Sequence, residues 1–118
     1  MGKFPSCAPK PGDRFPYMLY NYGGVPVNIQ ERVKGLGFHL FTFTKDKPFS
    51  EIQRVAEKYG HILTSETILF SSEVIQLFER LGIESCGCYL IRPDLYIAYR
   101  SVKPDSVHFE SWLQRFLK

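Results

Sequence analysis

The chain has 118 residues, with 15 Lys and Arg against 12 Asp and Glu, and hydrophobic and aromatic fractions of 44% and 15%. This length fits one domain with a single core. The basic residues are scattered along the chain rather than clustered in a stripe, so we expect no nucleic-acid partner. The apolar runs fall far short of the roughly 20 residues that span a bilayer, so we expect no membrane partner and a cytoplasmic location.

The first part of the chain predicts a tail followed by a β-hairpin. Residues 1–12 hold three prolines and little apolar periodicity, so we interpret them as a tail or linker and assign the domain to residues 13–118. Two short strands, Tyr17–Tyr20 and Val25–Ile29, flank a Gly-Gly pair, which favours a tight turn between them.

The middle of the chain predicts a β-α-β unit. Gly37–Thr44 is rich in aromatic and β-branched residues, which is typical of a buried central strand. Apolar residues then recur at helical spacing over Ile52–Tyr59, and Gly60 would end that helix. Ile62–Thr64 and Thr67–Phe70 both have strand character, and the pattern does not decide whether they form one strand or two.

The last part predicts a helix, a β-hairpin and a final helix. Helical spacing returns over Val74–Leu81, and strands Cys88–Ile91 and Tyr96–Tyr99 flank the turn-forming Arg92–Leu95. Phe109–Phe116 carries one apolar face. The order is therefore β-hairpin, then β-α-β, α, β-β, α. It predicts an α/β protein with a thioredoxin-like mixed sheet and helices on both faces.

Two segments resemble a known family. Residues 11–16 read Pro-Gly-Asp-Arg-Phe-Pro, and residues 87–100 read Gly-Cys-Tyr-Leu-Ile-Arg-Pro-Asp-Leu-Tyr-Ile-Ala-Tyr-Arg. Together they resemble the C-terminal thioredoxin-like domain of FAD-dependent aromatic hydroxylases, the phenol 2-monooxygenase type. The resemblance implies that the residues carrying these motifs are structural: Asp13, Arg14, Arg92, Pro93, Asp94, Tyr99 and Arg100.

The resemblance also implies a role. The chain would be a non-catalytic domain that acts in packing and dimer assembly, and its partner would be the flavin-binding body of a parent enzyme or a second copy. FAD and NAD(P)H would belong only to that parent, because no G-x-G-x-x-G follows a strand here. A free-standing binding module is an alternative. Such domains usually carry glycine where Leu95 stands, so Leu95 is strained if the turn keeps the same type.

The cysteines do not stand where this fold activates a thiol. A thiol oxidoreductase needs a cysteine at the helix start after the central strand, and residues 44–51 contain none. Cys86 and Cys88 would close only a small, strained disulfide loop, so we expect them to be buried small residues. A small thiol-dependent redox protein that uses this pair is the alternative.

No metal or catalytic histidine is expected. The three cysteines and one histidine lack the paired ligand spacing of a zinc site. His39, His61 and His108 have no cysteine, serine or paired carboxylate beside them at a catalytic spacing. We therefore expect no catalytic residue in this chain.

The N-terminal hairpin is the predicted interface. Its aromatic residues exceed what a small sheet edge buries, and its proline must lie on an edge because it has no N–H group to donate. A hairpin that merely flanks the sheet is an equally good interpretation. The candidate interface residues are Tyr17, Tyr20, Tyr22 and Pro26.

Two further expectations concern packing. The last helix has only one apolar face, so we expect Trp112 and Phe116 to be buried against the sheet. We also expect two ion pairs that fix loops, Asp13 with Arg14 and Asp94 with Arg100.

Overall fold

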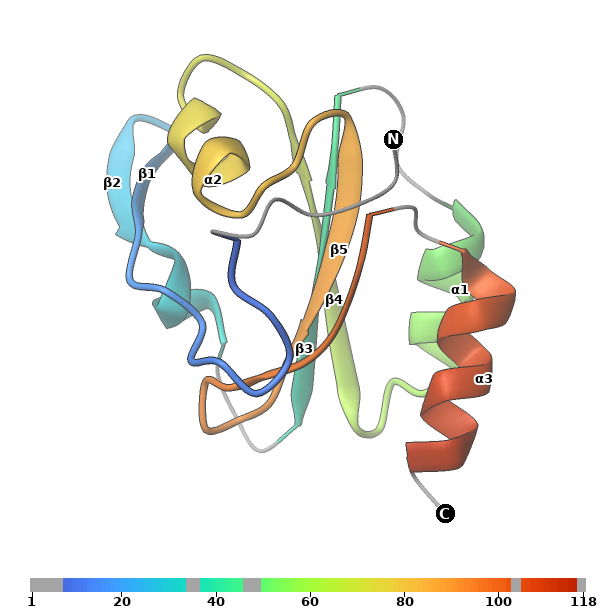
Figure 1. Cartoon of the computed structure of the whole chain (residues 1–118). Helices are drawn as coiled ribbons and strands as arrows, with labels where there is room; N and C mark the ends of the chain where they lie inside the picture. Colours follow the sequence, from blue (N-terminus) through green and yellow to red (C-terminus); the bar gives the residue numbers. More distant parts are fainter. Residues whose placement is uncertain (1–7, 34–36, 46–49, 103–104, 117–118) are drawn as a thin grey trace.

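The computed structural model describes residues 8–33, 37–45, 50–102 and 105–116. Its central sheet has the strand order β4-β3-β5-β6 (Figure 1). Strands β3 and β4 are parallel, whereas β5 is antiparallel to both β3 and β6. The predicted mixed sheet is confirmed. The four strands are β3 (Phe38–Thr44), β4 (Leu63–Leu69), β5 (Cys86–Ile91) and β6 (Ile97–Ser101).

Strand β3 is the buried interior strand that its composition predicts. Its residues from His39 to Thr44 are all buried, and Phe41 has no exposed surface. Because side chains alternate along a strand, Phe41 and Phe43 face one layer and Leu40 faces the other. Both faces of the sheet are therefore covered.

Two helices cover one face of the sheet. They are α1 (Ser50–Lys58) and α3 (Ser106–Phe116), which lie side by side in Figure 1. An ion pair between Lys58 and Glu110 joins them. Asp105 caps the start of α3, because its Oδ1 accepts the backbone N–H groups of Val107 and His108. The core of this layer consists of Leu40, Ile52, Val55, Ala56, Leu63, Cys88, Leu90, Tyr99, Phe109 and Leu113.

The N-terminal hairpin and α2 cover the opposite face (Figure 1). The hairpin consists of β1 (Leu19–Tyr22) and β2 (Val25–Asn28), and the short helices are η1 (Ile29–Arg32) and α2 (Ile75–Arg80). Both glycines of the turn have positive φ, 60° and 84°, which the twist of a two-residue hairpin requires. The predicted hairpin is therefore present. Its first strand begins at Leu19, two residues later than the sequence predicts.

The prediction that Trp112 and Phe116 are buried against the sheet is wrong for Phe116 and only partly correct for Trp112. Phe109 and Leu113 are buried against the sheet, but Trp112 is half-buried and Phe116 is 49% exposed. Phe109 and Leu113 form one row on α3, and Trp112 and Phe116 form a second. The two rows are offset by about 60° around the helix axis, so only one of them can face the sheet. Trp112 and Phe116 instead stack on each other, with ring centroids 4.8 Å apart.

The strand-like segments after α1 form one strand, not two. Strand β4 runs without interruption past the polar pair Ser65 and Glu66, because each of its residues pairs with β3. The register joins Phe38 to Leu63 and Thr44 to Leu69.

Residues 8–12 contact the sheet although their composition suggests a tail. Gly12 N donates to Ile97 O over 2.9 Å, and Pro9 O accepts hydrogen bonds from Tyr89 and Arg100. Ala8 and Pro9 are buried. The contacts of the folded unit thus include this segment, whereas residues 1–7 lie outside the described part.

Candidate functional site

Of the two cysteines of β5, Cys88 lies in an environment that suppresses thiol reactivity. Cys88 has no exposed surface, and burial raises the pKa of its thiol to about 12. Reactive cysteines have the opposite property, a lowered pKa that yields thiolate at neutral pH. Cys86 is partly exposed and lies 3.5 Å from Val102 O. Cys88 therefore has the character of a structural residue, and Cys7 lies outside the described part.

The described residues contain no cluster of metal-binding side chains. No group of three His, Cys, Asp or Glu residues in the described ranges could hold a metal ion. The ring of His108 bonds to Tyr99, with 2.7 Å between Nδ1 and Oη, and His61 is exposed on the surface. Nor does any helix in these ranges have the length and apolar character needed to cross a membrane.

The family-motif residues form a clamp between the N-terminal segment and the β5–β6 turn. Phe15 N donates to Leu95 O over 2.7 Å, and Ile97 N donates to Asp13 O over 2.9 Å. The guanidinium of Arg14 lies 6.0 Å from the ring centre of Tyr96, within cation–π range. The two motifs are distant in sequence but adjacent in space.

The predicted ion pairs of this clamp form with other partners. Asp13 pairs with Lys10 rather than Arg14, and hydrogen bonding from the Lys10 backbone N–H lowers the pKa of its carboxyl. Asp94 pairs with Arg92 at 2.6 Å rather than with Arg100. Each carboxylate forms its ion pair with the basic residue of its own turn, which lies only two or three residues away in the sequence.

Leu95 adopts the left-handed conformation that glycine would favour. Its φ is +73°, and its N–H donates to Arg92 O over 2.9 Å, which closes the turn. A side chain at such φ is strained by roughly 1–2 kcal/mol. The Leu95 side chain packs against the core layer under the hairpin, which offsets part of that strain.

The exposed apolar residues of the hairpin form what we call the hairpin surface: Tyr17, Leu19, Val25 and Pro26. Tyr17, Leu19 and Val25 are 66%, 52% and 59% exposed. Tyr20, predicted to join them, is only 7% exposed and belongs to the core, because alternation along β1 turns it inward. The Tyr22 side chain lies outside the described part.

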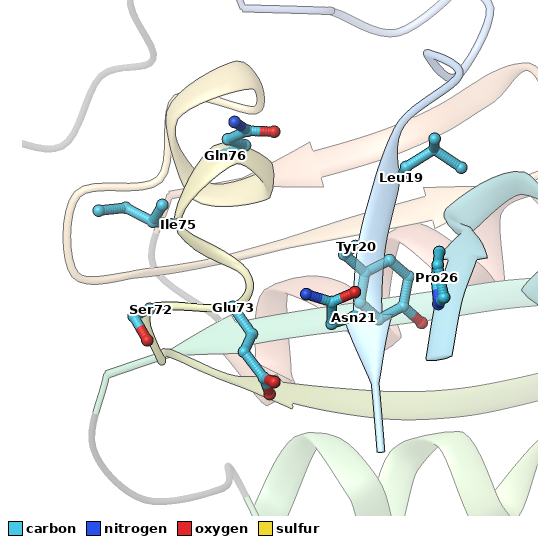
Figure 2. Close-up of a pocket in the computed structure, with 8 residues that line it drawn as sticks. All are labelled: Leu19, Tyr20, Asn21, Pro26, Ser72, Glu73, Ile75 and Gln76. Carbon is cyan, nitrogen blue, oxygen red and sulfur yellow. The ribbon is translucent and has the colours of Figure 1, made fainter. Parts of the chain in front are cut away.

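A pocket of about 260 Å³ separates the hairpin surface from α2 (Figure 2). Leu19 and Pro26 contribute from the hairpin, and the half-exposed Ile75 contributes from α2. Sequence reasoning missed Leu19 and Ile75. Ile75 falls outside the helical spacing that buries Val74 and Leu77, and an isoleucine at such a position is a signal of an exposed apolar surface.

A partly buried polar cluster lies beside the hairpin. Glu66 on β4 accepts hydrogen bonds from Arg32, with Nε 3.2 Å from both carboxylate oxygens. His39 Nε2 lies 3.3 Å from Oε1 of the same carboxylate. Burial would raise the pKa of the Glu66 carboxyl, but the hydrogen bonds from His39 and Arg32 outweigh it and lower that pKa. Sequence spacing gave no signal for this cluster, because its members are far apart along the chain.

A groove follows β4 past this cluster, and we call it the β4 groove. Two adjoining hollows of about 360 and 370 Å³ form it, and Arg32 and Glu66 line both. One wall is β4, and the other comprises the hairpin, η1 and the start of α2. The remaining lining residues are Tyr20, Asn21, Gly23, Glu31, His39, Thr64, Ser65, Thr67, Ile68, Leu69, Glu73 and Val74.

Comparison with known proteins identifies the fold. No protein-family description matches the sequence, and no curated protein does. Among solved structures, the chain is similar to aklavinone-11 hydroxylase in complex with FAD and aklavinone (TM-score 0.67, 22% identity), covering 89% of this chain and 21% of that one. The flavin-dependent monooxygenase PieE gives similar values: TM-score 0.62, 21% identity, and 89% and 19% coverage.

Thiol-active proteins share the same fold. The thiol peroxidase from Chromobacterium violaceum matches with a TM-score of 0.73 and 13% identity, covering 94% of this chain and 90% of that one. All these identities are low, so the likeness shows the fold: the domain is thioredoxin-like. The chain spans about a fifth of the flavin-dependent hydroxylases it matches.

Proposed function

We propose that this chain is the C-terminal, non-catalytic thioredoxin-like domain of a larger FAD-dependent hydroxylase of aromatic compounds, the phenol 2-monooxygenase type, in the cytoplasm. The observation that carries the proposal is the match over 89% of this chain to only a fifth of two flavin-dependent hydroxylases. The motif clamp supports it, because the two segments that resemble the family are the two that contact each other.

The domain acts by packing against the flavin-binding body through the hairpin surface. The hairpin surface has four exposed apolar residues, and apolar surface of this kind gains free energy when a partner removes it from water. Leu19, Pro26 and Ile75 would form the centre of the contact because they line one pocket (Figure 2). Dimer assembly of the parent through the same surface is the second part of the proposal.

FAD and NAD(P)H fit the parent rather than this chain. Both carry a diphosphate, and the β4 groove holds three glutamates against one arginine, which Glu66 already binds. Such a site repels a polyanion.

The test begins with the coding sequence directly upstream, where an in-frame flavin-binding region is expected. The flavin-binding body is then mixed with this chain and binding is measured by calorimetry. Leu19→Asp should weaken binding by at least about tenfold, because it places a charge in the centre of the contact. Val107→Asp is the matched control, because Val107 is 76% exposed on α3, on the other face of the sheet. Equal binding of the flavin-binding body by Leu19→Asp and Val107→Asp would show that the hairpin surface is not the contact.

A second candidate is a small thiol-dependent redox protein that uses Cys86 and Cys88. The match to a thiol peroxidase over nearly the whole length of both chains favours it, whereas the raised pKa of Cys88 opposes it. Insulin-disulfide reduction or hydroperoxide turnover by the wild-type chain, lost in Cys86→Ser with Cys88→Ser, would establish this candidate and displace the first.

A further inference from the structure

The outer edge of β4 is unpaired among the residues that the structure describes. Strand β4 is the last strand in the order of the sheet, and its only strand partner in those ranges is β3. Phe38 N donates to Ile62 O and Phe70 N donates to Thr44 O, so the even-numbered positions of β4 direct their backbone groups to β3. In a parallel pair the alternate positions point away. The N–H and C=O groups of Ser65 and Thr67 therefore face outward.

An unpaired strand edge is a template for a further strand. Backbone groups at such an edge recognise any extended segment, and the pockets beside it select its side chains. The β4 groove runs along this edge, from Thr64 and Ser65 to Leu69 and the start of α2. An added strand would thus place alternate side chains in the groove.

The charge of the groove selects a basic segment. Glu31 and Glu73 are exposed on its rim, and the described residues give neither a cationic partner. Arg32, the one arginine of the lining, is bound to Glu66 over 3.1 Å, and His39 also contacts Glu66. The groove is therefore acidic although the whole chain carries a net charge of +3. Lysine or arginine side chains on an added strand would complement it.

We propose that the β4 groove binds an extended peptide segment of another protein, rich in lysine or arginine, which adds to β4 as a fifth strand. This inference goes beyond the proposed function, because it concerns the edge of β4 and not the hairpin surface. A second copy of the chain is a poorer occupant, since symmetric pairing through β4 would bring a second set of the same glutamates to the groove.

The probe is a fluorescein-labelled heptapeptide of alternating valine and lysine, titrated with the full chain and followed by fluorescence anisotropy. The chain should bind this peptide saturably. It should bind the valine–glutamate counterpart at least about tenfold more weakly, because the charges no longer match. A valine–lysine peptide that is N-methylated at alternate residues should lose binding, because it cannot pair with a strand edge. Equal binding of the methylated peptide would overturn the proposal.

Variants of the chain test both features of the groove. Glu31→Lys with Glu73→Lys should weaken binding about tenfold, and Glu57→Lys with Glu84→Lys is the matched control, because both residues are exposed outside the groove. Ser65→Pro removes one outward N–H without touching the bonds to β3, and Ser65→Ala is its control. If Ser65→Pro fails to fold, the methylated peptide decides the same question.

Three further results would overturn the proposal. They are binding that does not saturate at millimolar peptide, equal binding by the two charge-reversal variants, and a dimer in sedimentation that peptide does not dissociate but Ser65→Pro does. Such a dimer would mean that a second copy of the chain, not a peptide, occupies the edge of β4. Leu19→Asp should leave peptide binding unchanged, so failure here is distinguishable from failure of the proposed hairpin contact.

Discussion

His39 on β3 and Glu66 on the neighbouring β4 share a short contact, 3.3 Å between Nε2 and Oε1, with both side chains largely buried. Hydrogen bonds from His39 and Arg32 hold the pKa of the Glu66 carboxyl below its ordinary value of 4.5. A carboxyl whose pKa is lowered by folding stabilises the folded state above its unfolded pKa, and this contribution disappears as the pH falls through the folded pKa.

Glu66→Gln should therefore destabilise the domain at neutral pH, by about 1–3 kcal/mol, because Arg32 and His39 lose an ionised acceptor. The difference from wild type should shrink as the pH falls below about 4.5. Urea unfolding at a series of pH values measures it. Glu57→Gln, on the exposed side of α1, is the control and should show no such trend. A constant difference between wild type and Glu66→Gln across this range would contradict the role assigned to the carboxylate.

At most positions alanine gives a more stable protein than glycine, but the positive φ of Leu95 predicts the reverse order at this position. Both Leu95→Ala and Leu95→Gly remove the same packing, but only glycine adopts a φ of +73° without strain. Leu95→Gly should be more stable than Leu95→Ala by about 1 kcal/mol. At the half-buried Ala98 of β6, replacement by glycine should instead be destabilising. Denaturant melts of the three variants test this, and a more stable Leu95→Ala would show that the turn relaxes.

The two rows of α3 should differ in their contribution to stability. Phe109→Ala should cost about 3–5 kcal/mol, because Phe109 is 1% exposed in the core. Phe116→Ala should cost only about 1 kcal/mol, since its ring is half exposed and loses mainly the contacts with Trp112 and Phe38. Thermal and urea unfolding would measure both, and similar losses would show that Phe116 is covered in solution.

The thiol of Cys88 should resist modification until the chain unfolds. Its pKa of about 12 leaves almost no thiolate at pH 8, and the side chain has no exposed surface. Cys86 should be alkylated faster because it is partly exposed. Mass spectrometry after timed iodoacetamide treatment separates the two sites. Fast labelling of Cys88 in the native chain would reopen the redox interpretation.

The elements that sequence patterns predicted well are those with local causes. Strand β3 was recognisable because six consecutive residues are buried, and α1 because its apolar spacing fits one face. The sequence left open whether Ile62–Thr64 and Thr67–Phe70 form one strand or two, because the polar Glu66 between them is bound by Arg32, which is 34 residues away. No local pattern contains that partner.

The candidate surfaces were harder to predict for the same reason. Tyr17 and Pro26 are exposed, but Tyr20 is turned into the core by the register of β1 with β2. The groove depends on where η1 and α2 lie against β4, which spacing along the chain does not give. The prediction of the hairpin as an interface stays a prediction.

The contacts of Pro9 bear on the order in which the domain can form. Its carbonyl bonds to Tyr89 and Arg100, which are 80 and 91 residues later in the chain. Closing so long a loop costs more chain entropy than closing the local hairpins, so these contacts should form late in folding. During synthesis this segment leaves the ribosome before its partners on β5 and β6, which follow 80 and 91 residues later. These contacts of Pro9 are therefore completed only after Arg100 has been made.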